Sequence, residues 1–198
     1  MNSAVFGAPR RGVAPEAAQA AVIAGTGLWV FIGVASTLFA LFLSAYVMRM
    51  NGSGDWSQIG LPWQLWLSTA LLVAGSALLQ RASRARDAVS ARQQLLAGGA
   101  CAIGFLLVQL WGWQVLQAAR VVVVGNPAAS FFYVLTTLHG LHVIGGLVGW
   151  VIALRNPTPW RIALCARYWH FLLAVWGVLF AALGWLTPGV VDFICGRS

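Results

Sequence analysis

Charged residues are scarce in this chain. Of its 198 residues only 8 % are charged, whereas 60 % are hydrophobic. A water-soluble globule of this composition would have too few charges to cover its surface. No lysine is present, so all 12 basic residues are arginines, against 4 acidic residues. The composition therefore excludes an ordinary soluble domain and predicts a membrane protein.

The few charges are clustered, and long charge-free gaps separate the clusters. Each gap exceeds the roughly 20 residues that a helix needs to cross about 30 Å of hydrocarbon. The gaps are continuously apolar, without the alternation of a transmembrane β-strand, so a β-barrel is set aside. The gaps are residues 17–48, 56–80, 93–119, 121–154 and 168–191.

These gaps predict an all-α, polytopic membrane protein built as a bundle of five transmembrane helices. One domain, residues 21–190, holds the bundle. Residues 1–20 are expected to form a disordered cytoplasmic tail, and residues 191–198 a periplasmic tail. The helices are expected at about 25–48, 60–80, 94–117, 129–154 and 168–187.

The arginines also predict how the chain is oriented. The N-terminal tail and the loops around 81–92 and 155–167 hold two, four and three arginines, whereas the other loops and the C-terminal tail hold one each. Cytoplasmic loops are enriched in basic residues. The N-terminus is therefore expected in the cytoplasm and the C-terminus in the periplasm.

Some of these arginines are also candidate contacts for anionic lipid headgroups at the cytoplasmic surface. The plainer interpretation is a solvated orientation signal. Because the arginines are spread over several loops rather than lining one face, no nucleic-acid partner is expected. The candidate residues are Arg81, Arg84, Arg86, Arg92 and Arg167.

Several kinds of chemistry lack the residues they would need. The three cysteines form no disulfide, CxxC or zinc pattern. No Asp, Glu, Lys or Arg lies inside a predicted span, whereas pumps and ion-coupled carriers place such groups in the bilayer. No catalytic motif is present either. These residues favour a non-catalytic helical subunit without a cofactor or metal of its own.

Histidines are the remaining candidates for ligands, and there are three. His139 and His142, three residues apart, share one face of a helix. They are expected roughly 22 and 18 Å from the cytoplasmic edge, and His170 only about 3–5 Å from it. At different depths the three cannot share a haem or metal. We expect them instead to donate hydrogen bonds to neighbouring helices.

A pair of glycines follows these histidines. Gly145 and Gly149 have the GxxxG spacing, which lets two transmembrane helices approach closely. The pattern predicts that the helix over residues 129–154 packs tightly against the protein through this pair.

Two segments resemble the last two helices of the cytochrome c oxidase subunit III family: "FFYVLTTLHGLHVIGGLVGW" and "ARYWHFLLAVWGVLF". Two earlier segments are similar to its preceding helices: "GLWVFIGVASTLFALFLSAYVMR" and "LPWQLWLSTALLVAGS". The resemblance extends over about residues 25–188. Within the family, the chain is most similar to the short five-helix bacterial form. The residues that match the family motifs are His139, His142, Tyr168, Trp169, His170 and Trp176.

The resemblance implies a subunit without a redox centre in the bacterial cytoplasmic (inner) membrane. Its partners would be subunits I and II of a haem–copper oxidase, which carry haem and copper, and phospholipids between its helices. Family members commonly have carboxylates where this chain has Ala35 and Leu173. We therefore expect scaffold and lipid roles rather than proton transfer.

Other functions remain open at this stage. Subunit III of a quinol oxidase and an accessory subunit of nitric oxide respiration share the resemblance. A stand-alone b-type haem membrane protein would use the histidines. A small transporter is favoured only by the number of helices.

Overall fold

The structure is a computed structural model that describes residues 13–51, 56–57, 59–121, 126–187 and 189–191. Within them it has five long helices, each long and apolar enough to cross a membrane. They are α1 (Val13–Asn51), α2 (Gln64–Arg84), α3 (Ala88–Ala118), α4 (Pro127–Arg155) and α5 (Pro159–Trp185). The predicted all-α, five-helix fold is confirmed.

Short capping sequences set the starts of three helices. The Asp87 carboxylate accepts a hydrogen bond from the Ser90 amide at 2.7 Å, which caps α3. The Asn126 side chain accepts from the Ala128 amide at 3.0 Å, and Pro127 supplies the fixed φ of a first helical turn. Pro159 begins α5 in the same way. These signals divide the apolar sequence into separate spans.

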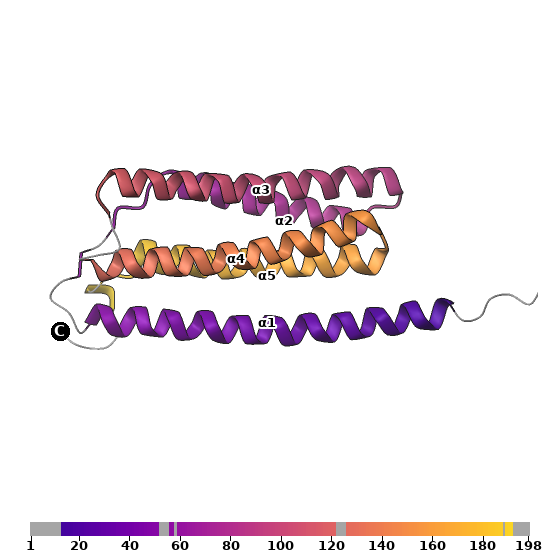
Figure 1. The fold of residues 1–198 in the computed structure, drawn as a ribbon, viewed down its shortest axis with the longest axis horizontal. Helices are drawn as coiled ribbons and strands as arrows, with labels where there is room; N and C mark the ends of the chain where they lie inside the picture. Colours follow the sequence, from indigo (N-terminus) through magenta and orange to yellow (C-terminus); the bar gives the residue numbers. More distant parts are fainter. Residues whose placement is uncertain (1–12, 52–55, 58, 122–125, 188, 192–198) are drawn as a thin grey trace, which may run out of the picture.

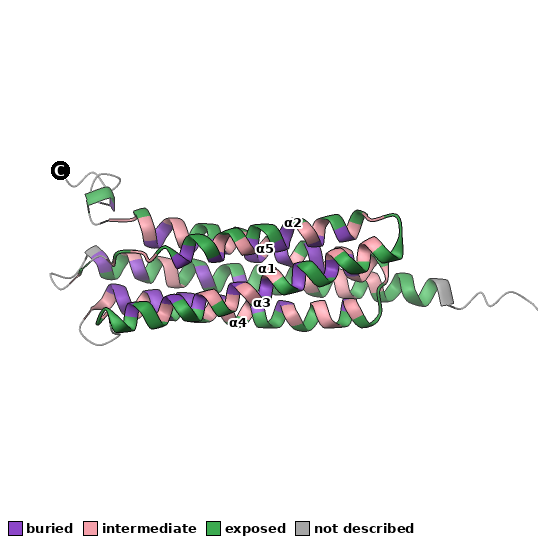
Figure 2. Cartoon of the chain, turned by 90° about the horizontal axis from the view of Figure 1, so that it is seen from above, coloured by how far each residue is buried: buried purple, intermediate pink, exposed green. Residues whose placement is uncertain are grey.

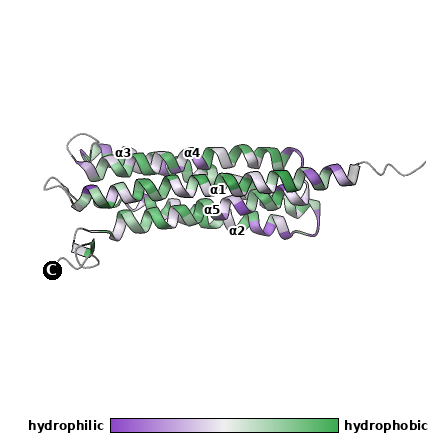
Figure 3. Cartoon of the chain, turned by 90° about the horizontal axis from the view of Figure 1, so that it is seen from below, coloured by the Kyte–Doolittle hydropathy of each residue, from purple (hydrophilic) through white to green (hydrophobic). Residues whose placement is uncertain are grey.

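The helices form three layers (Figure 1). The α4–α5 pair lies between the α2–α3 hairpin on one side and α1 on the other. Among the described helices, α1 contacts only α4 and α5. The hydrophilic residues gather at the end of the bundle where α1 begins and α2 ends (Figure 3).

The α2–α3 hairpin is the most closely packed part of the bundle. Its buried positions recur every three or four residues on both helices, as in an antiparallel coiled coil. Small residues let the backbones approach. A Cβ atom added to Gly98 would lie 2.8 Å from Leu79 Cγ, and one added to Gly75 would lie 3.3 Å from the Gly98 carbonyl oxygen. The buried α3 residues are Leu95, Gly98, Gly99, Ala102, Phe105, Gln109, Gly112 and Leu116.

Helix α1 is the least buried element. Only 11 % of its most apolar stretch is buried, against 39 % for α2, α3 and α5. Large apolar side chains such as Trp29, Val34 and Leu41 are exposed on it, and Figure 2 shows this exposure along the helix. An apolar face of this kind is suited to lipid or to a partner helix rather than to water.

Three helices begin well before the expected positions. Residues 13–20 belong to α1 rather than to a disordered tail, α3 begins at Ala88 rather than near residue 94, and α5 begins at Pro159 rather than near residue 168. Charge-free gaps locate the hydrocarbon crossing, but a helix continues past it wherever no residue stops it. Residues 1–12 and 192–198, which hold the rest of the expected tails, lie outside the described residues.

Candidate functional site

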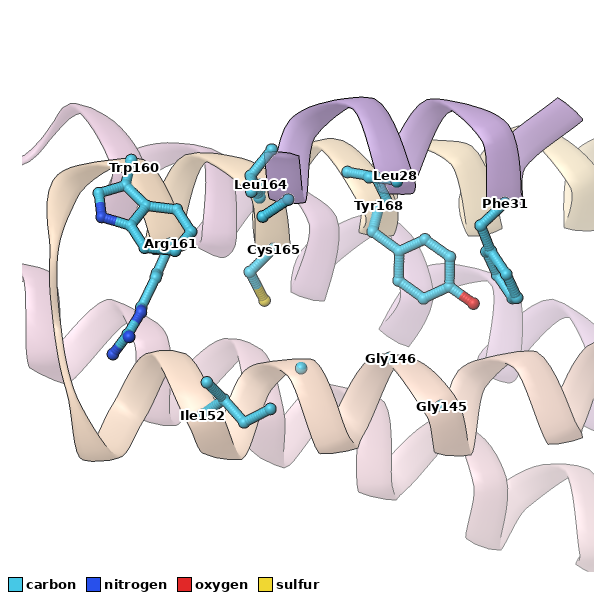
Figure 4. Close-up of a pocket in the computed structure, with 13 residues that line it drawn as sticks. Leu28, Phe31, Gly145, Gly146, Ile152, Trp160, Arg161, Leu164, Cys165 and Tyr168 are labelled. Carbon is cyan, nitrogen blue, oxygen red and sulfur yellow. The ribbon is translucent and has the colours of Figure 1, made fainter. Parts of the chain in front are cut away.

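One candidate site is a cleft of about 630 Å³ between α1, α4 and α5. Leu28 and Phe31 of α1 form one wall, and Ile152 of α4 lies across from them. Figure 4 shows Trp160 and Arg161 of α5 at one end and Tyr168 with Phe31 toward the other. The cleft therefore runs along the helices rather than across them.

The cleft exists because small residues on α1 and α4 face each other without meeting. Nothing lies within 4 Å of a Cβ added to Gly27 or Gly149, and the nearest atom to one added to Gly145 is Tyr168 Oη at 4.0 Å. The prediction that the Gly145–Gly149 pair packs tightly is therefore wrong. The pair lines an open cleft, because no atom of α1 lies within 4 Å of a Cβ at either position.

Another glycine of α4 makes the close contact instead. A Cβ atom on Gly146 would lie 3.0 Å from Tyr168 Cε1 and 3.2 Å from Leu172 Cδ1. The Tyr168 hydroxyl donates a hydrogen bond to the His142 carbonyl oxygen at 3.0 Å. The α4–α5 pair is thus held at the inner end of the cleft by ring packing and one hydrogen bond.

The cleft has apolar walls and one cation. The Arg161 guanidinium lies 5.1 Å from the Trp160 ring centroid and donates a long hydrogen bond of 3.4 Å to the Asn156 carbonyl oxygen. Most of its donors remain available, because guanidinium has five N–H groups. The arrangement can hold a long apolar chain with an anionic group at the Arg161 end.

His139 lies in the centre of the bundle. Its side chain is fully buried, and its ring centroid is 5.7 Å from that of Phe105 and 5.2 Å from that of Trp176. Neither ring nitrogen has a hydrogen-bond partner among the described residues. The expected bond from His139 to a neighbouring helix is therefore not found.

His142 faces α1. Its Nδ1 donates to the Leu138 carbonyl oxygen of its own helix at 2.8 Å, and its ring centroid lies 5.2 Å from that of Phe39 and 5.8 Å from that of Phe31. Its hydrogen bond therefore stays within α4, although the expectation was a bond between helices. Because this bond is made to the Leu138 carbonyl oxygen of the same helix, the ring can pack against α1.

His170 does bond a neighbouring helix. The Gln80 amide nitrogen donates to His170 Nε2 at 2.8 Å, while the Gln80 oxygen accepts from Arg84 Nε at 3.0 Å. His170 Nε2 is then an acceptor, so Nδ1 carries the proton and donates to Ser76 Oγ at 2.6 Å. A chain of hydrogen bonds thus joins α5 to the end of α2.

The expected difference in depth between the histidines is also wrong. His170 lies eleven residues into α5, about 17 Å from its start, because α5 begins at Pro159. Tyr168, two residues earlier, bonds the His142 carbonyl, so His170 and His142 lie at similar levels. The three histidines are separated by direction instead. Within the described part of the chain, no three His, Cys, Asp or Glu residues cluster to form a metal site.

The remaining predicted residues have separate roles. Trp169 is fully buried, and Trp176 Nε1 donates to Thr69 Oγ1 of α2 at 2.8 Å. Arg167 lies 5.9 Å from the Trp29 ring centroid of α1. The four arginines near the α2–α3 turn are exposed and do not line the cleft. They are Arg81, Arg84, Arg86 and Arg92.

The sequence reasoning missed two important residues. Trp150 Nε1 donates to the Leu95 carbonyl oxygen at 2.7 Å, which joins α4 to α3. Arg161 had been counted only as an orientation signal. Its place in a "PTPWR" segment, where an aromatic residue adjoins a cation at a helix start, was the available hint of a headgroup site.

No family model matches the chain. Known proteins do. A probable cytochrome c oxidase subunit 3 of Nocardia farcinica is 30 % identical over 82 % of this chain and 86 % of that protein. Cytochrome c oxidase subunit 3 of Synechocystis is 30 % identical over 78 % and 72 %, and that of Bacillus subtilis 25 % over 79 % and 83 %. With five membrane-compatible helices and this similarity along most of its length, the chain belongs to the cytochrome c oxidase subunit 3 family and is a multi-pass membrane subunit of a haem–copper oxidase.

Proposed function

We propose that the chain is the non-catalytic subunit III of a respiratory cytochrome c oxidase in the bacterial cytoplasmic membrane. It stabilises the oxygen-reducing, proton-pumping subunit I, beside subunit II, and binds phospholipid in the cleft between α1, α4 and α5. Haem and copper belong to the partner subunits. The observation that carries the lipid role is an apolar cleft of about 630 Å³ with Arg161 at one end.

The chemistry of the cleft supports a phospholipid over other occupants. Its walls offer apolar contact along the direction of the helices, which is the direction of acyl chains in a bilayer. Arg161 supplies donors for a phosphate, and guanidinium binds phosphate with two parallel hydrogen bonds. A lipid in this position joins α1 to the rest of the bundle, because it contacts both walls.

The orientation proposed for the chain places this headgroup in the cytoplasmic leaflet. Arg161 lies at the same end of the bundle as the start of α1 and the end of α2, where basic residues are frequent. By the positive-inside rule this end faces the cytoplasm. The exposed arginines of the α2–α3 turn then form a second surface for anionic headgroups.

The exposed apolar face of α1 is the surface that we assign to the membrane and the partner subunits. Val34 and Leu41 are exposed on it, and Trp29 is largely exposed beside Arg167 of α5. Because α1 is held by α4 and α5 alone, contact with a partner or lipid contributes to its position. Loss of either is expected to weaken the complex during turnover.

A first experiment tests assembly. The tagged chain is purified from its native membranes in mild detergent, and the copurifying proteins are identified by mass spectrometry together with an optical spectrum. We expect a catalytic subunit with haem and copper. Recovery of the chain alone, from membranes that contain such an oxidase, would contradict the proposed role.

A second experiment tests the lipid. Gly145→Leu with Gly149→Leu fills the cleft, whereas Gly177→Leu places the same side chain where no atom lies within 4 Å and outside the cleft. The double variant should copurify with less phospholipid than the Gly177 control, measured by lipid mass spectrometry per assembled complex. Arg161→Gln should lose anionic lipid, while Arg155→Gln should not. Equal lipid content in all variants would refute the site.

A further inference from the structure

Three buried amide and imidazole side chains have polar atoms without a partner among the described residues. Gln64 of α2, Gln109 of α3 and His139 of α4 are 3 %, 5 % and 0 % exposed. Five of their polar atoms have no hydrogen-bond partner among the described residues. They are Gln64 Oε1, Gln109 Oε1, Gln109 Nε2, His139 Nδ1 and His139 Nε2.

Gln109 and His139 lie near one level of the bundle. Phe105, one turn before Gln109 on the same face of α3, contacts the His139 ring. Trp113, one turn after Gln109, donates to Thr136 Oγ1 at 3.2 Å, and Thr136 lies one turn before His139. Gln109 is therefore placed between two contacts to the same segment of α4.

Gln64 approaches this level from α2. A Cβ atom on Gly112, one turn from Gln109, would lie 3.6 Å from Gln64 Cβ. Gln64 is also the first residue of α2, at the end of the bundle opposite the α2–α3 turn. The three side chains thus extend from one end of the bundle toward its centre.

The kind of ligand follows from the donors and acceptors. The Gln109 amide offers both, and a neutral imidazole offers one of each. The rings of Phe39, Phe105 and Trp176 pack around His139, and none of them carries a charge. A neutral ligand that both donates and accepts matches this set, and it must be small because the surroundings are packed with rings. Water has these properties, and buried water commonly pairs polar groups of this kind.

We propose that Gln109 and His139 form an internal water-binding site between α3 and α4, which water reaches past Gln64 from the end of the bundle where α2 begins. In the site the Gln109 amide nitrogen donates to water and its oxygen accepts, while the two His139 nitrogens act as one donor and one acceptor. The hydrocarbon around the bundle offers no other hydrogen-bond partner for these atoms.

Radiolytic hydroxyl labelling tests the site, using the full chain in its native membrane in H₂¹⁸O. Hydroxyl radicals formed from a bound water oxidise the side chains beside it. Trp176, which contacts His139, should therefore gain ¹⁸O although it is only 1 % exposed. Leu79, which is fully buried in the α2–α3 seam against Gly98 and has no polar side-chain atom, is the internal control and should stay unlabelled. Equal labelling of both, or no label on Trp176, would overturn the proposal.

Variants then assign the water to its ligands. Gln109→Leu should reduce the label on Trp176 to the background found at Leu79, whereas His139→Gln, which keeps a donor and an acceptor, should retain it. Gln94→Leu is the matched control, since this half-buried glutamine of α3 lies near the other end of the helix. If Gln109→Leu folds, as its circular dichroism and assembly show, and the label persists, the assigned ligands are wrong. Neither labelling outcome depends on lipid in the cleft or on a particular partner subunit.

Discussion

Glycines on α3 and on α4 have opposite roles in this molecule. Gly98 and Gly99 of α3 have no room for a Cβ atom, because Leu79 and the Trp150 indole ring pack directly on them. Gly145 and Gly149 of α4 border open space. The first pair closes the contacts of α3 with α2 and α4, and the second leaves a cleft beside α1. Glycine spacing alone therefore does not distinguish a helix contact from a ligand site.

The same contrast holds for whole helices. The α2–α3 hairpin is joined by a three-residue turn and a continuous seam of buried residues, whereas α1 is mostly exposed and touches only α4 and α5 among the described helices. The hairpin is stabilised by its own packing. The position of α1 depends on what fills the cleft and what covers its outer face.

Adding one methyl group to each kind of glycine should produce the largest difference. Gly99→Ala forces Trp150 away and strains its hydrogen bond to Leu95, at a cost of about 1–3 kcal/mol typical of overpacking. Gly149→Ala meets no atom and should be neutral or stabilise the helix by up to about 1 kcal/mol. The thermal inactivation midpoint and the amount of assembled complex measure both. Similar losses of stability in the two variants would show that the packed and the cleft-lining glycines do not differ in this way.

Hydrogen exchange compares the helices directly. After removal of bound phospholipid, the amides at the cleft-lining part of α1 should exchange about tenfold faster, while those of the α2–α3 seam should change little. A factor of ten corresponds to about 1.4 kcal/mol of local stability. Mass spectrometry of peptides from residues 24–31 and 98–105 provides the comparison. Equal acceleration in both peptides would show that α1 is not a separate unit.

The Tyr168 hydroxyl lies where the cleft meets the packed α4–α5 contact, so its removal tests what holds that contact. Tyr168→Phe removes the donor to the His142 carbonyl and should destabilise the α4–α5 pair by about 0.5–1.5 kcal/mol. Tyr46→Phe is the control, because it removes the same hydroxyl group from a tyrosine whose contacts among the described residues are made by its ring. Unfolding in mixed micelles gives the two free energies. An unaffected Tyr168 variant would mean that ring packing alone holds this contact.

The smallest expected effect is at the hairpin turn. The hydrogen bond from the Ser90 amide holds the pKa of the Asp87 carboxyl below its ordinary value. The ionised cap therefore contributes fully above the unfolded-state pKa of about 3.9, and the contribution is lost as the pH falls through the lower folded pKa. Asp87→Asn keeps a capping oxygen without the charge. Its melting temperature should fall less than that of the wild type between pH 5 and about 3, and identical pH profiles would contradict this assignment.

The sequence was sufficient for the number and type of elements, because charge-free gaps of this length have one structural solution in a bilayer. It was insufficient for the starts of α1, α3 and α5, because a helix extends beyond the hydrocarbon as far as a capping residue or a proline allows, such as Asp87 for α3 and Pro159 for α5. The directions of the histidines were also not predictable. They depend on neighbours far away in the sequence, such as Ser76 for His170 and Trp176 for His139.

The cleft was missed for a related reason. A GxxxG pattern indicates that another helix could approach closely, but whether a contact forms depends on the residue that faces the glycines. Gly146 meets Tyr168, whereas Gly149 faces no side chain. The reverse holds for Gly99, whose partner Trp150 lies 51 positions later in the sequence. A pattern within one helix contains no information about such distant partners.

The position of α1 has a consequence for how the protein is made. Helices α1 and α2 follow each other in sequence, yet α1 packs against α4 and α5, which are synthesised after the α2–α3 hairpin. During translation the α2–α3 hairpin can close as soon as its second helix enters the membrane, because its contacts are local. Helix α1 enters the membrane before this hairpin, but it acquires its contacts only when α4 and α5 have followed.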